Sequence, residues 1–140
     1  MISVLEVCFY DTNAIDDSLL NFAVIVAKYK DKWIFCKHKE RETLELPGGR
    51  REENEAIVDT AKRELFEETG AVSFKLTPIS IYSVKRESEI FGMLYYAHVD
   101  ELDQLPKSEI EQVELFEHIP INLTYPLIQP RLLAKVRSLI

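Results

Sequence analysis

The chain has 140 residues, 46% of them hydrophobic and 29% charged, with a formal net charge of −7. This is the composition of a soluble globular protein, and we expect one domain over residues 1–140. The acidic balance argues against binding to a nucleic-acid polymer, which normally requires a basic surface. No apolar stretch reaches the length of a membrane span, so we expect no membrane association.

The first third of the chain predicts strands. Met1–Tyr10 is apolar but has no basic leader or cleavage site, so we interpret it as a strand rather than a signal peptide. Asn21–Lys28 predicts a buried strand, and Trp33–His38 predicts the return strand of a hairpin that turns at Tyr29–Lys32. Thr43–Leu46 predicts a short strand that ends at a Pro-Gly-Gly breaker.

The clearest helix is predicted over Asn54–Thr69. Asn54 is the expected N-cap, and Gly70 stands where a left-handed residue often ends a helix. An apolar residue recurs every fourth position and predicts one buried stripe, formed by Ile57, Ala61 and Leu65.

The second half predicts strands over Ser73–Tyr82 and Phe91–Val99, a short strand over Glu114–His118, and a last helix that begins near Pro126 or Pro130. Strands before, between and after helices indicate an α/β (α+β) fold with a mixed β-sheet covered by helices. The last helix is expected to be amphipathic, with Leu132, Leu133, Val136 and Leu139 inward and Arg131, Lys135 and Arg137 outward.

Three acids of the first helix carry the chemical signal. Glu64, Glu67 and Glu68 are spaced i, i+3 and i+4, so they share one helix face and repel one another. The same carboxylates converge where a hard cation such as Mg²⁺ or Mn²⁺ could bind. The alternative is a solvated acidic face, stabilised by Lys62 and Arg63.

Arg63 and a glycine loop surround these acids. Glu55, Asp59, Arg63 and Glu67 form a ladder of i, i+4 neighbours, so Arg63 can bridge acids and fix their side chains. The glycines of Pro47-Gly48-Gly49 allow positive φ angles and let a backbone carbonyl approach a metal or phosphate closely.

The segment Gly49–Ala71 resembles the Nudix box, G-x5-E-x7-R-E-U-x-E-E-x-G-U, where U is a bulky apolar residue. Ala71 is smaller than the usual last residue, a departure that concerns packing. The resemblance is to small, mutator-T-like nucleotide pyrophosphohydrolases, and it implies the Nudix fold over the whole chain. Every other fixed position is met, by Gly49, Glu55, Arg63, Glu64, Leu65, Glu67, Glu68 and Gly70.

The resemblance implies a hydrolase that uses Mg²⁺ or Mn²⁺ to cleave a diphosphate linkage. Cations would hold the phosphates and lower the pKa of bound water, which explains how an acidic protein could bind an acidic substrate. By resemblance, Glu67 and Glu68 are the main metal ligands, the Gly48 carbonyl is a further ligand, Glu64 is a ligand or the base, and Glu55 and Arg63 orient the others.

Further site residues lie outside the motif. A downstream acid often completes such sites, and of Glu109, Glu111 and Glu114 we favour Glu111 as a metal ligand. For phosphate binding the candidates are Arg50 and Arg51, then Lys37, Lys39 and Arg41. For stacking on a base they are Tyr82, Phe91, Tyr95 and Trp33. His38, His98 and His118 show no metal spacing, and we assign them no role.

The leading substrate hypothesis is a nucleoside triphosphate or its oxidised form, such as 8-oxo-dGTP, cleaved to the monophosphate and pyrophosphate. Alternatives are hydrolysis of ADP-ribose, a nucleotide sugar or a dinucleoside polyphosphate, a catalytically silent sensor domain, and a prenyl diphosphate isomerase. We expect a small nucleotide as the partner, a monomer or homodimer, and a cytoplasmic location in which Cys8 and Cys36 stay reduced.

We predict that Glu67→Gln or Glu68→Gln lowers turnover about a hundredfold or more, because each change removes a charged oxygen expected to hold a cation. Steady-state kinetics measures the loss, and circular dichroism should show an intact fold. Full activity in both variants would contradict the assignment.

Overall fold

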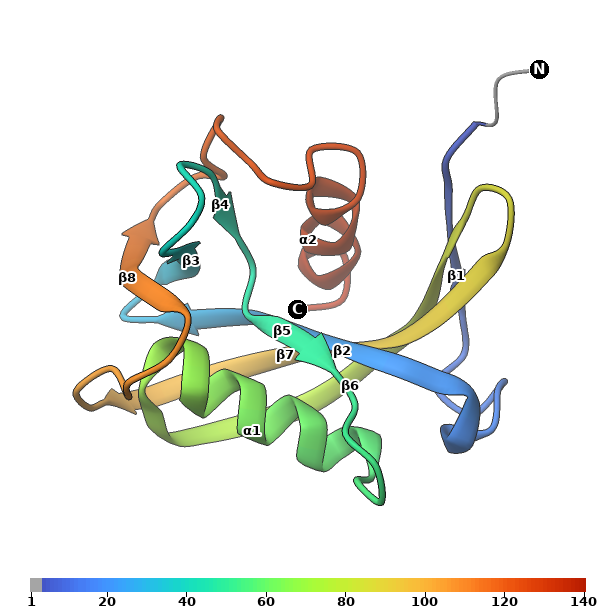
Figure 1. Ribbon diagram of the computed structural model, residues 1–140, viewed down its shortest axis with the longest axis horizontal. Coiled ribbons are helices and arrows are strands. Elements are labelled where there is room, and N and C mark those ends of the chain that lie inside the picture. Colours follow the sequence, from blue (N-terminus) through green and yellow to red (C-terminus); the bar gives the residue numbers. More distant parts are fainter. Residues whose placement is uncertain (1–3) are drawn as a thin grey trace.

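A computed structural model describes residues 4–140. Its eight-stranded sheet has the order β1-β6-β7-β2-β3-β4, with β5 paired to β2 and β8 paired to β3 (Figure 1). No helix of this described part is both long and apolar enough to cross a membrane. The elements are β1 (Glu6–Tyr10), the 3₁₀ helix η1 (Asp17–Leu19), β2 (Leu20–Tyr29), β3 (Lys32–His38), β4 (Leu44–Glu45), β5 (Gly48–Arg50), α1 (Ile57–Thr69), β6 (Ala71–Lys85), β7 (Glu89–Leu102), β8 (Ile110–Phe116) and α2 (Gln129–Arg137).

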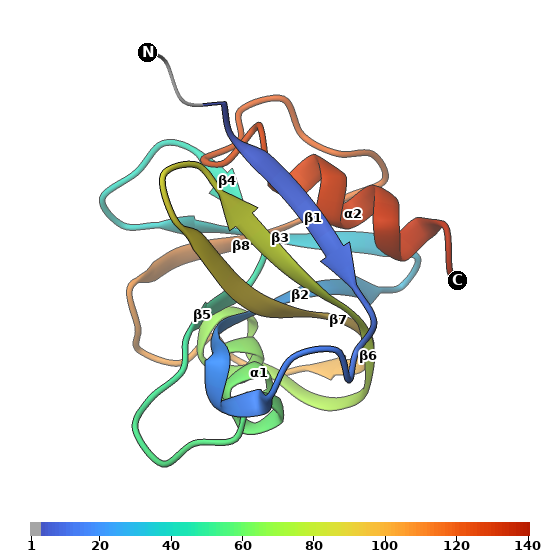
Figure 2. The ribbon, with the colours of Figure 1, turned by 90° about the vertical axis from the view of Figure 1, so that its right-hand side faces the viewer.

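The central strand β2 explains why the sheet is covered on both faces. It pairs in parallel with β7 and antiparallel with β3. Successive side chains of a strand point to opposite faces, and Ala23 and Ile25 pack with the apolar stripe of α1, whereas Val26 packs with the buried leucines of α2. The two helices therefore lie on opposite faces of a mixed sheet (Figures 1 and 2), which confirms the predicted fold class.

The structure contains the predicted strands, but several of them begin or end at other residues than predicted. Of the strand expected over Met1–Tyr10, residues 6–10 form β1, and residues 1–3 lie outside the described part. The turn between β2 and β3 is confirmed: Lys30 and Asp31 have φ angles of 49° and 64°, as in the tight turns that match strand twist.

The pairing of strands with one another accounts for the moved boundaries. β6 and β7 form one long hairpin that extends the predicted strands at both ends, because backbone pairing continues through polar residues. The strand expected over Glu114–His118 is instead β8, which starts at Ile110 and stops at Phe116. Its register with β3 sets these limits, since His38 pairs with Ile110 and Trp33 with Phe116.

The helix α1 begins later than predicted. It starts at Ile57 with Ala56 as its N-cap, so the assignment of Asn54 as N-cap was wrong. Asn54 has a φ of 65° and lies in the turn in which the Glu55 amide donates to the Glu52 carbonyl. The end was predicted correctly, because Gly70 has a φ of 79° and its amide donates to the Phe66 carbonyl.

The last helix also fits its prediction except at its end. It begins beside Pro130 and buries Leu132, Leu133 and Val136. Leu139 follows the end of α2 and is 58% exposed, so its predicted inward position was wrong. Lys135 is partly buried and places its ammonium group 5.3 Å from the centre of the Phe9 ring.

We predict that Leu65→Ala lowers the free energy of unfolding by about 2–5 kcal/mol, because Leu65 is fully buried between α1 and the sheet. Its neighbour Phe66 is 44% exposed, and Phe66→Ala should change stability by about 0.5 kcal/mol. Urea denaturation of both variants tests this, and equal losses would show that the α1 stripe does not anchor the helix.

Candidate active site

The glycine loop lies directly against the acids of α1. The Gly48 amide donates to Glu68 Oε1 at 2.8 Å. A Cβ added to Gly49 would come within 2.5 Å of the Glu64 carboxyl carbon, and one added to Gly48 within 2.4 Å of the Ala23 carbonyl oxygen. Neither glycine uses the positive φ that glycine allows. The glycines are needed because a side chain would not fit between β2 and α1.

Arg63 joins the predicted acids into one network. Its Nε and Nη2 donate to the two oxygens of Glu55 at 2.7 and 3.0 Å. Its Nη1 donates to Glu64 at 2.7 Å and to Glu67 at 3.3 Å. A further bond from Nη2 reaches the Arg50 carbonyl at 3.0 Å. One cation thus ties the helix acids to each other and to the loop after β5.

Glu55 serves this network as an anchor. Hydrogen bonds from Arg63 lower the pKa of Glu55 to about 2, and the Thr60 hydroxyl and the Glu52 amide also donate to it. Hydrogen bonds with Glu55 and Glu64 in turn raise the pKa of Arg63. The sequence reasoning missed Thr60, a buried hydroxyl that follows Glu55 by five residues.

Glu68 is the most perturbed of the acids. It is 8% exposed, and burial raises its pKa to about 8 against the lowering effect of the Gly48 hydrogen bond. The charges of Glu64, Glu45 and Glu109 raise it further. Burial also raises the pKa of Glu64, although Arg63 opposes this. Buried carboxylates crowded by like charges mark a place where a cation would be stabilised.

These donors fit a hard divalent cation by their chemistry, since all are carboxylate oxygens beside an open glycine backbone. Among residues 4–140, no three acidic, His or Cys side chains are already spaced to enclose an ion. Arg63 occupies the space between Glu64 and Glu67. Glu67, with its side chain 46% exposed, is the acid most free to turn.

His38 and Glu45 extend the cluster beyond the predicted residues. His38 Nε2 contacts Glu45 Oε1 and lies 3.7 Å from Glu68 Oε2. Arg41 Nη1 donates to both oxygens of Glu45. The assignment of no role to His38 therefore overlooked a residue next to Glu68. Residues two apart on a strand share a face, so His38 lies on the same face of β3 as Cys36. Cys36 is buried and its thiol donates to the Glu68 carbonyl, so this alternation could have placed His38 near Glu68.

Of the downstream acids, Glu109 is the one that lies beside His38 and acts on Glu68. Glu111 forms an ion pair with Lys37 at 3.2 Å, which holds it to a neighbour on β3. Glu109 lies 4.0 Å from His38 Nδ1, and its charge contributes to the raised pKa of Glu68. Glu114 lies on β8 opposite Phe35 of β3. A metal role for any of the three stays a prediction.

The basic candidates separate into free and occupied groups. Arg51 donates to the Asp17 carboxylate and to the carbonyls of Asp17 and Ser18, so it holds η1 in place. Arg41 is occupied by Glu45. Arg50 is exposed and lines a pocket beside the loop, and Lys39 is exposed at the edge of a second cleft with His38 and Glu109.

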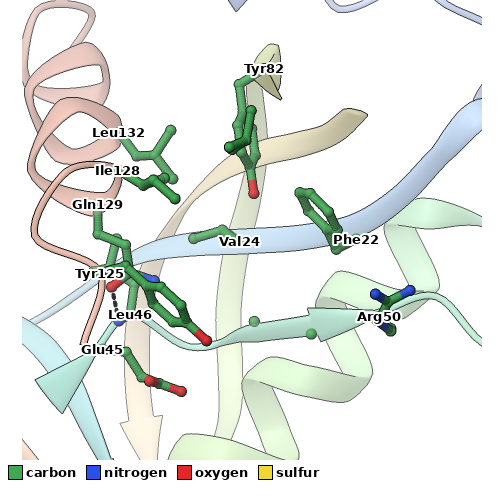
Figure 3. A pocket seen from close by; sticks show the side chains of 13 residues that line it. Phe22, Val24, Glu45, Leu46, Arg50, Tyr82, Tyr125, Ile128, Gln129 and Leu132 are labelled. Carbon is green, nitrogen blue, oxygen red and sulfur yellow. Dashed lines mark hydrogen bonds between the residues drawn. The ribbon is translucent and has the colours of Figure 1, made fainter. Parts of the chain in front are cut away.

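That pocket lies between the glycine loop and α2 and measures about 280 Å³. Gly48 and Gly49 form one wall, so the pocket and the acid cluster share the loop. Figure 3 shows the side chains that surround it. The sequence reasoning found Tyr82 and Arg50 but missed Phe22, Glu45, Tyr125 and Gln129, which come from separate parts of the chain.

The other aromatic candidates lie elsewhere. Trp33 is buried in the core beneath α2 and carries the Lys28 ammonium 4.7 Å from its ring centre. Tyr95 is in the core on the α1 side, and Phe91 packs against Tyr10. Tyr82 alone of the four lines the pocket, with its ring centre 5.7 Å from that of Phe22.

We predict that the metal-free protein loses stability as the pH rises from about 4.5 to about 8, because the unfolded chain releases the Glu68 proton in this range while the folded chain retains it. Glu68→Gln cannot ionise and should flatten this decline. Urea denaturation of both proteins with a chelator present, at pH 5, 7 and 8.5, measures the difference. Parallel curves would contradict the raised pKa.

Comparison with known proteins agrees with this geometry. A 102-residue segment is 32% identical to the Bacillus subtilis protein YtkD, provisionally named an 8-oxo-dGTP diphosphatase; it covers 71% of this chain but only 64% of that relative. The crystal structure of the Bacillus subtilis pyrophosphohydrolase BsRppH, in a glutamate-to-alanine variant, matches with a TM-score of 0.79 and 26% identity, over 97% of this chain and 91% of that one.

The fold is shared more widely. The Nudix domain of Shewanella oneidensis NrtR, solved with ADP ribose, matches with a TM-score of 0.66 and 18% identity, over 92% of each chain. The model of the NUDIX domain matches residues 18–133, which include every site residue discussed above except Asp17 and Tyr10. The chain therefore belongs to the Nudix family.

Proposed function

We propose that the protein is a Mg²⁺- or Mn²⁺-dependent hydrolase that cleaves the diphosphate linkage of a nucleoside diphosphate derivative. The leading substrate is a nucleoside triphosphate or its oxidised form, such as 8-oxo-dGTP, with a nucleoside monophosphate and pyrophosphate as products. The observation that carries the proposal is the shared wall: Gly48 and Gly49 contact the acid cluster on one side and the pocket on the other.

The acid cluster supplies the chemistry. Nudix hydrolases generally use divalent metals, and here Glu68, Glu64 and Glu67 would hold the ions. The bound ions would neutralise the phosphates and lower the pKa of water. Glu68 and Glu64 have raised pKa values without a metal, so each is suited to accept a cation. Arg63 keeps the acids in position by its bonds to Glu55 and Glu64.

The pocket supplies a place for the nucleoside. Its walls are largely apolar, and aromatic rings from Phe22, Tyr82 and Tyr125 line it, as expected of a site for a flat ring. Arg50 lies at its edge next to the loop and can contact phosphates. The names of the two Bacillus subtilis proteins, a diphosphatase and a pyrophosphohydrolase, support the same type of reaction.

A catalytically silent sensor domain is the main alternative. Loss of one or more acids of the motif would favour it, but Glu55, Glu64, Glu67 and Glu68 are all present and connected through Arg63 or Gly48. A network of this kind serves no purpose in holding a nucleotide alone, since like charges near Glu68 oppose anion binding unless cations are present.

We predict that the protein hydrolyses nucleoside triphosphates with Mg²⁺ or Mn²⁺ and that a chelator abolishes the activity. A substrate panel of nucleoside triphosphates, 8-oxo-dGTP, ADP-ribose, a nucleotide sugar and a dinucleoside polyphosphate, with products identified by mass spectrometry, tests this. A monophosphate and pyrophosphate should form. Absence of hydrolysis across the panel with either metal, combined with measurable nucleotide binding, would favour the sensor domain.

A further inference from the structure

The pocket beside Gly48 contains an amide whose orientation is fixed. Gln129, at the start of α2, is 5% exposed, and its Oε1 accepts a hydrogen bond from the Leu46 amide at 2.8 Å (Figure 3). Because the backbone N–H can only donate, the oxygen must face Leu46, and the Nε2 amino group must point the other way. Rotation of the amide would leave the buried Leu46 N–H without an acceptor, which is unfavourable.

The Gln129 amino group reaches the space of the pocket. Within residues 4–140, every buried side-chain nitrogen or oxygen that is sealed from solvent has a hydrogen-bond partner. Gln129 lines the pocket, and the bond that Oε1 accepts is the only hydrogen bond that its side chain forms among the described residues; its backbone amide donates separately to the Tyr125 carbonyl. Its amino group is therefore an N–H donor that faces the pocket without a protein acceptor.

Tyr82 provides a second polar group in the same pocket. Tyr82 is 2% exposed, and burial raises the pKa of its hydroxyl. No hydrogen bond or charge from the described residues contributes to this rise. Figure 3 shows the Tyr82 hydroxyl directed into the pocket, toward the strand that carries Val24. Because no sealed side-chain oxygen of the described residues lacks a partner, this hydroxyl is reached from the pocket, where a ligand or water can bond it.

We propose that the pocket selects a nucleobase with a carbonyl oxygen on its edge, which accepts the hydrogen bond of Gln129 Nε2 while the Tyr82 hydroxyl bonds a second polar atom of the same ring. This rests on the proposed function, in that the substrate is a nucleoside diphosphate derivative. The apolar side chains of Phe22, Val24 and Leu132 provide the flat walls that such a ring needs.

The fixed amide explains why a carbonyl is preferred to an amine. The 6-position of guanine or hypoxanthine carries an oxygen acceptor, whereas that of adenine carries an N–H donor. An amine placed against Gln129 Nε2 would bring two donors together and leave both unsatisfied. Sites that present a buried polar group discriminate strongly against a ligand that lacks its partner.

Inosine and adenosine triphosphates make a matched pair, since they differ at the 6-position of the purine. We expect kcat/KM for the inosine compound to exceed that for the adenosine compound about tenfold or more. Gln129→Glu, assayed at pH 9 to ionise the new carboxyl, retains an acceptor for Leu46 but has no N–H. It should reduce the ratio about tenfold. Gln104→Glu, an exposed control that adds the same charge, should keep the wild-type ratio.

Tyr82→Phe removes the hydroxyl and keeps the ring. We expect it to raise KM for the inosine compound about fivefold or more with a smaller change in kcat, because it removes binding to a part of the substrate remote from the phosphates. Tyr96→Phe, a partly buried tyrosine on the same face of the sheet but outside the pocket, should leave KM unchanged. If Gln129→Glu fails to fold, Tyr82→Phe still tests the proposal independently.

Binding of the free nucleosides separates this proposal from the proposed function. NMR titration with inosine and adenosine requires neither metal nor hydrolysis, and inosine should bind more tightly in the wild type but not in Gln129→Glu. If inosine binds more tightly as expected but no nucleotide of the panel is hydrolysed, the pocket assignment is supported and the proposed reaction is overturned. Hydrolysis with equal preference for the two bases in wild type and both variants would overturn the pocket assignment alone.

Discussion

The bonds from Arg63 to three glutamates are the constraint on which the site depends. Glu64 and Glu67 share one face of α1 and would repel each other, and Glu55 precedes the helix in a turn with no helical hydrogen bonds of its own. One guanidinium offsets this repulsion and also bonds the Arg50 carbonyl at the end of β5. The position of the loop relative to the helix is thereby set by charge as well as by packing.

Much of the fold could be predicted because its signals are local. The run of Val, Ile and Ala in β2, the stripe of α1 and the left-handed Gly70 each depend on residues close in sequence. Boundaries that depend on distant pairing were harder to predict. The limits of β8 follow from its register with β3, and Asn54 looked like an N-cap although a turn places it before the helix.

The same distinction applies to the site. The acids of α1, Arg63 and the glycines follow from motif spacing, and the structure brings them together as a connected cluster. The pocket is assembled from β2, β5, β6 and the start of α2, so no local pattern reports it. Tyr82 was predicted from four aromatic candidates as the one that binds substrate, without a local pattern to support the choice. Gln129 had no signal at all, because its side chain acts through contact with Leu46, 83 positions earlier.

The bond between Leu46 and Gln129 also has a consequence for the order of folding. Leu44, two residues earlier, exchanges backbone hydrogen bonds with Asn122 and Thr124, so the strand leading into the glycine loop is held by the segment just before α2. During synthesis these partners leave the ribosome well after the glycine loop and α1. A growing chain can form α1 with its acids long before the opposite wall exists, and it acquires a closed pocket only when α2 docks.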